Sequence, residues 1–122
     1  MNQGRKVSGG KYHANRKSRL YDRKTQERQV ILGDTKRKKL RSRGGHEKTI
    51  LLRANEANLV HGKSVKKAQI INVIETPQNK FMARQNRLLK GAIIETSLGK
   101  ARITNRPSRE GQINAILISE EK

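Results

Sequence analysis

Aliphatic side chains are distributed unevenly along this chain, and their distribution limits which part of it can build a core. Residues 1–33 contain few of them before Val30-Ile31-Leu32, whereas most of the later sequence alternates aliphatic with polar residues. A segment that buries so little apolar surface cannot offset the conformational entropy lost when it becomes ordered. We therefore expect residues 1–33 to form a basic arm that is disordered when free, and residues 34–122 to form the folded domain.

The charge distribution supports the same division. The chain has 29 lysines and arginines against 10 acidic residues, and its formal net charge is +19. Residues 1–53 carry 17 basic and 4 acidic groups, whereas residues 54–122 carry 12 and 6. An excess of this size attracts polyanions, most often nucleic acids.

A membrane is the other polyanion to consider, and the sequence argues against it. No segment approaches the roughly 20 apolar residues that span a bilayer, and the first residues contain no hydrophobic signal region. A basic amphipathic helix with bulky anchors is also missing. The chain contains no cysteine, so it has neither disulfides nor thiolate metal sites, which agrees with a reducing cytosol.

The densest positive charge lies in residues 37–43. On a strand, alternation places Arg37, Lys39, Arg41 and Arg43 on one face, each about 6.6 Å from the next, because two residues of strand rise that far. This spacing is close to two phosphate steps of about 3.4 Å along one nucleic-acid strand. The alternative is a solvated edge strand that its lysines protect from aggregation. The alignment of four cations favours binding.

Two glycines follow this stretch. Gly44-Gly45 predicts a tight turn, because glycine accepts the positive φ angles that hairpin turns require. Glycines here and at positions 4, 9 and 10 would also let the backbone approach a nucleic acid closely, but turn formation alone explains Gly44-Gly45 equally well.

The later sequence predicts a mainly β fold, namely a small closed or partly open barrel with one short helix. In a strand over residues 48–54, Ile50, Leu52 and Ala54 share a face. The apolar run in residues 65–76 is too continuous for a strand with one wet face, so we expect it to be central in the sheet, or bent so that both of its faces are covered. Residues 78–89 have apolar residues at helical spacing and predict a short amphipathic helix or turn that ends at Lys90-Gly91.

Three further segments complete the predicted barrel. Residues 92–96 and 100–104 form a hairpin around Ser97-Leu98-Gly99. Residues 105–111 form a loop. The last strand lies within residues 113–118.

The sequence offers no convergent catalytic site, so we expect neither enzyme activity nor a cofactor or metal. His13, His46 and His61 lack metal-ligand spacing, and the acidic residues are dispersed, with no pair placed for magnesium-dependent nuclease chemistry. Neither Gly-Gly pair belongs to a Walker-type phosphate loop. Duplex DNA binders usually carry a recognition helix that follows another helix, whereas the helix predicted at residues 78–89 stands alone.

Aromatic residues make up only 2% of the chain, too few for a base-stacking platform. Affinity for nucleic acid must then come mainly from phosphate contacts and shape. We regard Lys63, Lys66 and Lys67 first as a solvated turn. The cations that we expect to contact nucleic acid lie in the arm and in the hairpin stretch; they are Arg5, Lys6, Lys11, Arg16, Lys17, Arg19, Arg37, Lys38, Lys39, Arg41, Arg43 and Lys48. Arg102, Arg106 and Arg109 near the later loop form a candidate second patch, for which the alternative is a set of isolated, solvated charges.

Several short motifs span nearly the whole chain; they are Gly4–Gly10, Arg41–Gly45 with Lys48 and Leu52-Arg53, Lys90–Thr96, Gly99–Arg102, Arg106-Pro107, and Gly111 with Asn114-Ala115. Together they resemble the small-subunit ribosomal protein eight family of the archaeal and eukaryotic type. His46 and Ser108 depart from the family pattern, which has asparagine and glycine there, and the compact length is similar to the archaeal form.

The resemblance implies a structural protein of the small ribosomal subunit in the cytoplasm, monomeric when free. Its partners would be small-subunit ribosomal RNA and neighbouring ribosomal proteins, with no membrane and no small-molecule substrate. The basic arm would thread between RNA helices and become ordered on contact. A ribosome-assembly factor that uses the same domain and an RNA-processing nuclease are the alternatives.

Overall fold

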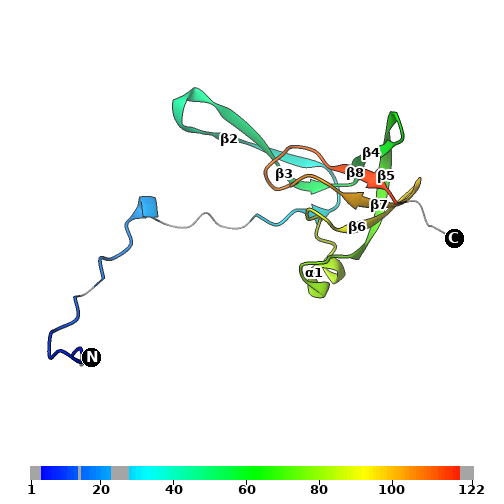
Figure 1. Ribbon diagram of the computed structural model, residues 1–122. Coiled ribbons are helices and arrows are strands. Elements are labelled where there is room, and N and C mark those ends of the chain that lie inside the picture. The colour runs from blue at the N-terminus through cyan, green and yellow to red at the C-terminus, as the bar shows by residue number, and fades with distance from the viewer. Residues whose placement is uncertain (1–3, 14, 23–27, 119–122) are drawn as a thin grey trace.

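The body of the protein is a closed five-stranded β-barrel, which confirms the predicted fold class (Figure 1). The computed structural model describes residues 4–13, 15–22 and 28–118. Consecutive barrel strands pair antiparallel, and a parallel pairing of the first strand with the last closes the barrel. The barrel strands are β4 (Glu56–His61), β5 (Ser64–Glu75), β6 (Ile93–Thr96), β7 (Gly99–Ile103) and β8 (Asn114–Leu117).

The barrel interior is narrow, and small side chains make room for large ones. Ala115 of β8 pairs with Leu59 of β4 on one side and with Ile103 of β7 on the other, and all three side chains are buried. Small barrels often alternate small and large interior residues in this way. The polar residues between them face outward, as their period-2 pattern predicts.

The long strand β5 is bent by two register shifts against β6, between Ile70 and Asn72 and between Val73 and Glu75. Each shift changes which side chains point inward, so Ile70 and Val73 are both buried. Ile71 and Ile74 remain 60% and 44% exposed. β5 thus lies between β4 and β6 and is bent, in agreement with the prediction, but the expected cover on both faces is wrong. Irregular pairing, and not a covering layer, accommodates its continuous apolar sequence.

The helix is shorter than the sequence predicts. α1 spans Lys80–Arg84, and the Asn79 side chain caps it by accepting a 2.9 Å hydrogen bond from the Phe81 amide. Asn86 has a φ of 51°, in the left-handed region that interrupts a helix. The predicted continuation from this point to Lys90 is therefore wrong. Leu88 instead lies fully buried in the core.

The strands at the end of the chain agree with the predictions. A two-residue connection at Ser97-Leu98 joins β6 to β7, and residues 105–111 form no strand. Lys100 and Arg102 of β7 face outward, whereas Ala101 and Ile103 are buried.

A second, three-stranded sheet comprises β1 (Ile31–Leu32), β2 (Lys36–Arg41) and β3 (Glu47–Ala54), with β3 in the centre. In β3, Ile50 and Ala54 are buried as predicted, but Leu52 is only half-buried. Leu51, which the alternation assigns to the opposite face, is 1% exposed and joins the barrel core. The prediction was wrong here because the middle of β3 is covered on both of its faces, with Ile50 buried on one face and Leu51 on the other.

The last residues of the predicted arm lie against the body. Val30 is fully buried, and its carbonyl accepts a 2.9 Å hydrogen bond from the Leu88 amide. The Leu32 amide donates to the Asn86 carbonyl at 3.0 Å. Residues 4–13 and 15–22 lie apart from the barrel (Figure 1), and the second of these segments includes the 3-10 turn η1 (Leu20–Asp22).

Burial at the base of the arm leads to a stability prediction. Val30→Ala should lower the free energy of unfolding by about 2 kcal/mol, because it deletes two buried methyl groups and leaves a cavity. Ile31→Ala is the control, since Ile31 is 40% exposed and should lose much less. Urea denaturation of the two variants measures the difference. Equal losses would contradict the idea that Val30 anchors the arm in the core.

Candidate nucleic-acid interface

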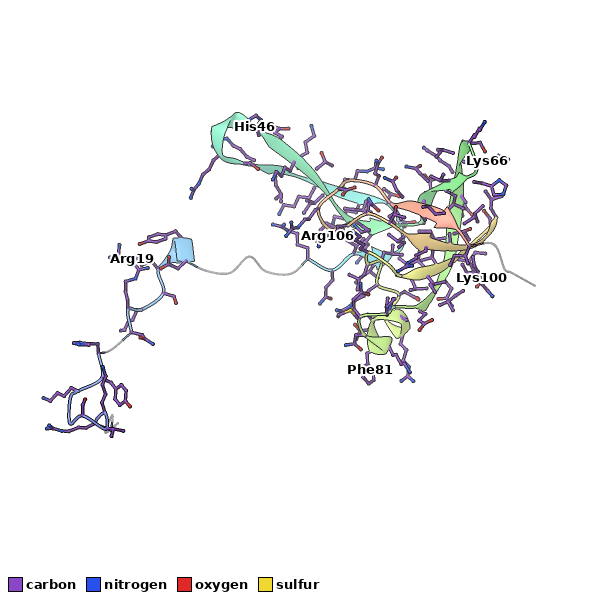
Figure 2. The ribbon with its side chains drawn as sticks, in the orientation of Figure 1. Arg19, His46, Lys66, Phe81, Lys100 and Arg106 are labelled. Atoms are coloured by element: carbon purple, nitrogen blue, oxygen red, sulfur yellow. The ribbon has the colours of Figure 1, made fainter. Side chains whose placement is uncertain are left out.

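The hairpin formed by β2 and β3 projects from the barrel and carries the densest charge of the folded part. Figure 2 shows His46 at its far end. All of β2 is exposed except the half-buried Leu40. Residues 36–48 include one acid, Glu47, whose carboxylate lies 3.8 Å from Lys39 Nζ. The seven cations within residues 36–48 are Lys36, Arg37, Lys38, Lys39, Arg41, Arg43 and Lys48, and Arg53 follows near the end of β3.

Both faces of the hairpin are basic. Directly paired residues share a face, so Lys39 lies with Thr49, and Arg41 lies with Glu47. On the other face, Lys38 pairs with Ile50, and Leu40 pairs with Lys48. The predicted cationic row therefore covers one side only, and Lys38 and Lys48 present charge on the opposite side.

The hairpin tip corrects the length of that row. Arg43 belongs to the 3-10 turn η2 (Arg43–Gly45) and not to β2, so the strand aligns three cations instead of four. Gly44 and Gly45 have φ angles of 78° and 76°, which confirms the predicted glycine turn. A 2.6 Å hydrogen bond from the Ser42 amide to the His46 carbonyl closes the turn.

The base of the hairpin is joined to the loop of residues 105–111. Arg37 Nε donates a 2.8 Å hydrogen bond to the Gly111 carbonyl. A Cβ atom at Gly111 would lie 3.0 Å from Thr49 Cγ2, so the loop backbone packs directly on β3. Arg37 therefore also fixes the position of the loop, a role that its charge alone does not predict.

The loop itself is held in shape by Asn105. Its side-chain amide donates to Glu110 Oε2 at 2.9 Å and to the Gln112 carbonyl at 2.8 Å, and its Oδ1 accepts from the Asn114 amide at 3.0 Å. The amides of Arg109 and Glu110 both donate to the Arg106 carbonyl. Arg106 and Arg109 thus extend from one tight turn.

These two arginines line a hollow of about 440 Å³ together with Arg28 and Lys90. Arg28 and Lys90 were not among the predicted contact residues. They lie far from Arg106 along the chain, so no local pattern indicates that they line the same hollow. Arg102 does not line this hollow, but a neighbouring one of about 400 Å³ that Lys90 also lines. Figure 2 shows Arg106 on the side of the barrel where the hairpin and arm leave, with Lys66 and Lys100 on the other side.

The predicted cations of the arm are all exposed; they are Arg5, Lys6, Lys11, Arg16, Lys17 and Arg19. Residues 5–11 fold back in a turn with a bridge between Arg5 and Lys11. Arg16 Nη2 lies 2.6 Å from Asp22 Oδ2, and the same oxygen accepts from the Arg19 amide. Arg16 is thus partly neutralised.

Within the described residues, no three His, Asp or Glu side chains are grouped so that they could hold a metal ion. The helices in that part of the chain are all too short and too polar to cross a bilayer.

Comparison with known proteins gives one consistent result. The sequence model of the family described as Ribosomal protein S8e matches residues 1–118. Proteins named "Small ribosomal subunit protein eS8" are similar across nearly their whole length. The chain is 42% identical to that of Halorubrum lacusprofundi over 116 residues (93% of each chain) and 44% identical to that of Methanococcus aeolicus over 119 residues (95% of this chain, 93% of the relative). It is 38% identical to that of Sulfolobus acidocaldarius over 122 residues (98% and 95%).

The close approach of the loop to the hairpin can be tested at Gly111. Gly111→Ala should lower the free energy of unfolding by about 1 kcal/mol, because the new methyl group crowds the branched Thr49 side chain. In a Thr49→Ala background the same change should be neutral or stabilising by about 0.4–1 kcal/mol, because the unfolded chain loses freedom. Denaturant unfolding of the four proteins measures the change of sign. A destabilisation of the same size in both backgrounds would rule out the contact.

Proposed function

The chain belongs to the ribosomal protein S8e family, and we propose that it is a structural constituent of the small ribosomal subunit that binds ribosomal RNA. The observation that carries this proposal is the sequence identity of about 40% to proteins named "Small ribosomal subunit protein eS8", which extends over more than nine-tenths of both chains. Its role is to hold folded RNA segments in place by their phosphates and shape, which supports subunit assembly and translation.

The geometry of the hairpin supports RNA binding on both of its sides. A ribbon with cations on two faces gains most where phosphates lie on both sides, as they do between packed RNA helices. Arginines can donate two parallel hydrogen bonds to one phosphate, whereas lysines act as point charges. We therefore propose that the hairpin inserts between RNA segments while the barrel rests against one of them.

The arm extends this clamp. Its exposed cations lie in a segment whose few apolar residues cannot form a core, so RNA phosphates would supply the counter-charge that orders it. The division of the chain into a basic arm that is disordered when free and a folded domain remains part of the proposal. We expect a monomer when free, located in the cytoplasm within the small subunit, next to ribosomal RNA and neighbouring ribosomal proteins.

The salt dependence of binding tests the hairpin. Replacing Lys39, Arg41 and Arg43 with glutamine should weaken binding to small-subunit ribosomal RNA and reduce the slope of log affinity against log salt by about 2–3, because each lost phosphate contact removes just under one unit. Filter binding across a salt series measures the slope. For the unmodified protein, about 6–10 phosphate contacts would lower the affinity 10³–10⁵-fold between 50 and 200 mM salt.

The matched control removes the same charge elsewhere. Replacing Lys63, Lys66 and Lys80 with glutamine removes three exposed cations from the β4–β5 hairpin and from α1, away from the β2–β3 hairpin. This variant should keep most of the affinity and of the slope. If the two triple variants lost affinity and slope equally, binding would depend on net charge alone and not on the β2–β3 hairpin.

Sedimentation separates a structural constituent from an assembly factor. A tagged copy of the protein should travel with mature small subunits and with translating ribosomes in a sucrose gradient. An assembly factor would be found with precursor particles and be absent from mature ones. Incubation of the purified protein with ribosomal RNA fragments and Mg²⁺ should leave the fragments intact, whereas cleavage would favour the nuclease alternative.

A further inference from the structure

The hollow beside the base of the arm combines charge with an apolar floor. Of the described residues that line it, Arg28, Lys90, Arg106 and Arg109 are basic and none is acidic. The floor is aliphatic, with Leu88 and Pro107 buried and Met82 and Leu89 half-buried. Cations that merely served solubility would not need to surround an apolar depression.

The walls of this hollow are fixed by hydrogen bonds. Gln78 Nε2 donates to the Lys90 carbonyl at 2.6 Å, which joins one rim to the segment that follows α1. The opposite rim is the tight turn of Arg106 and Arg109, held by Asn105 and by the contact of Gly111 with the hairpin. Arg28 reaches the hollow from a backbone held two residues later, where the Val30 carbonyl accepts from the Leu88 amide. The hollow is therefore preorganised.

We propose that this hollow, which we call the arm-root groove (Arg28, Met82, Leu88, Leu89, Lys90, Pro107 and the Arg106–Arg109 turn), binds an unpaired nucleotide of single-stranded RNA. The base lies against the aliphatic floor, and its flanking phosphates contact the cationic rim. The volume of about 440 Å³ falls within the roughly 300–1,000 Å³ of small-ligand sites. That RNA is the natural ligand rests on the proposed function.

A single strand fits this groove better than a duplex does. The bases of a duplex are stacked inside, so it presents phosphates and sugars but no free base face to a concave apolar surface. An unstacked nucleotide offers both an apolar face and charged neighbours. The groove also lies where the arm joins the body, so one RNA strand could pass from the arm across the groove to the loop and the hairpin.

The test separates base contact from phosphate contact in the full-length protein. The probe is a short fluorescent single-stranded oligouridylate, and fluorescence anisotropy is measured across a salt series. Arg106→Gln with Arg109→Gln should weaken binding about tenfold and lower the salt slope by about 1.4, which corresponds to two phosphates of a single strand. Met82→Gln should weaken binding about fivefold with the slope unchanged, because it removes an apolar contact of about 1 kcal/mol and no charge.

Matched controls exist on α1, the helix that contains Met82. Lys80→Gln with Arg84→Gln also removes two cations, but these side chains line a different hollow and should change neither affinity nor slope appreciably. Met82→Leu keeps the floor apolar and should bind as the unmodified protein does. Phe81→Gln alters an exposed ring outside the groove and should also bind normally. Thermal unfolding of each variant checks that the fold is intact.

Three results would overturn the proposal. Met82→Gln could bind oligouridylate as tightly as Met82→Leu, or it could weaken binding of an RNA duplex as much as that of the single strand. Alternatively, ultraviolet irradiation of intact small subunits could give no crosslink between RNA and Met82 or Pro107, while chemical crosslinking joined these residues to a protein segment. Crosslinks from either residue to an unpaired nucleotide would support it.

The failure of this proposal can be distinguished from failure of the proposed function. If the Lys39, Arg41 and Arg43 variant loses affinity for small-subunit ribosomal RNA while the groove variants bind oligouridylate normally, only the groove assignment is wrong. If the hairpin variant keeps full affinity for ribosomal RNA, the proposed binding mode of the hairpin fails, and the oligouridylate measurements still decide the groove.

Discussion

Packing inside a very narrow barrel is the interaction on which the rest of this structure depends. With only five strands around it, the interior has room for large aliphatic side chains only where alanines face them, as Ala115 does between Leu59 and Ile103. Such a core is small and contains no aromatic ring among the described residues. It must nevertheless stabilise the fold against the mutual repulsion of a large excess of positive charge. Closure of the sheet makes this feasible, because it leaves the barrel without unpaired edges.

The charged elements extend away from the core. The β2–β3 hairpin projects from the body beyond Leu51, and the arm extends from it beyond Val30; both of these residues belong to the core. Each element thus combines buried aliphatic residues where it meets the body with exposed cations beyond them. The loop of residues 105–111 connects them, because Arg37 and Thr49 contact it at Gly111, and Arg106 and Arg109 face the base of the arm.

The sequence predicted the features that local chemistry determines. Gly44-Gly45 indicated a turn because few other residues tolerate the φ angles there, and the alternation of residues 100–103 identified the faces of β7. It could not predict features that depend on tertiary contacts. The register shifts of β5 are set by its pairing with β6, and the early end of α1 depends on the left-handed Asn86. The arm-root groove joins residues from four separate segments, so Arg28 and Lys90 carried no local signal.

The parallel pairing that closes the barrel has a consequence for how the protein is made. Asn58 of β4 pairs with Asn114 of β8, 56 residues later, and their side chains share a 3.2 Å hydrogen bond. Contacts so distant along the chain slow folding, because the entropy of closing a long loop is lost before the contacts themselves stabilise the fold. During synthesis, the nascent chain can present its basic leader and hairpin sequence long before β8 has been translated. A compact body is therefore a late product of translation, and RNA phosphates can engage the leader before that body exists.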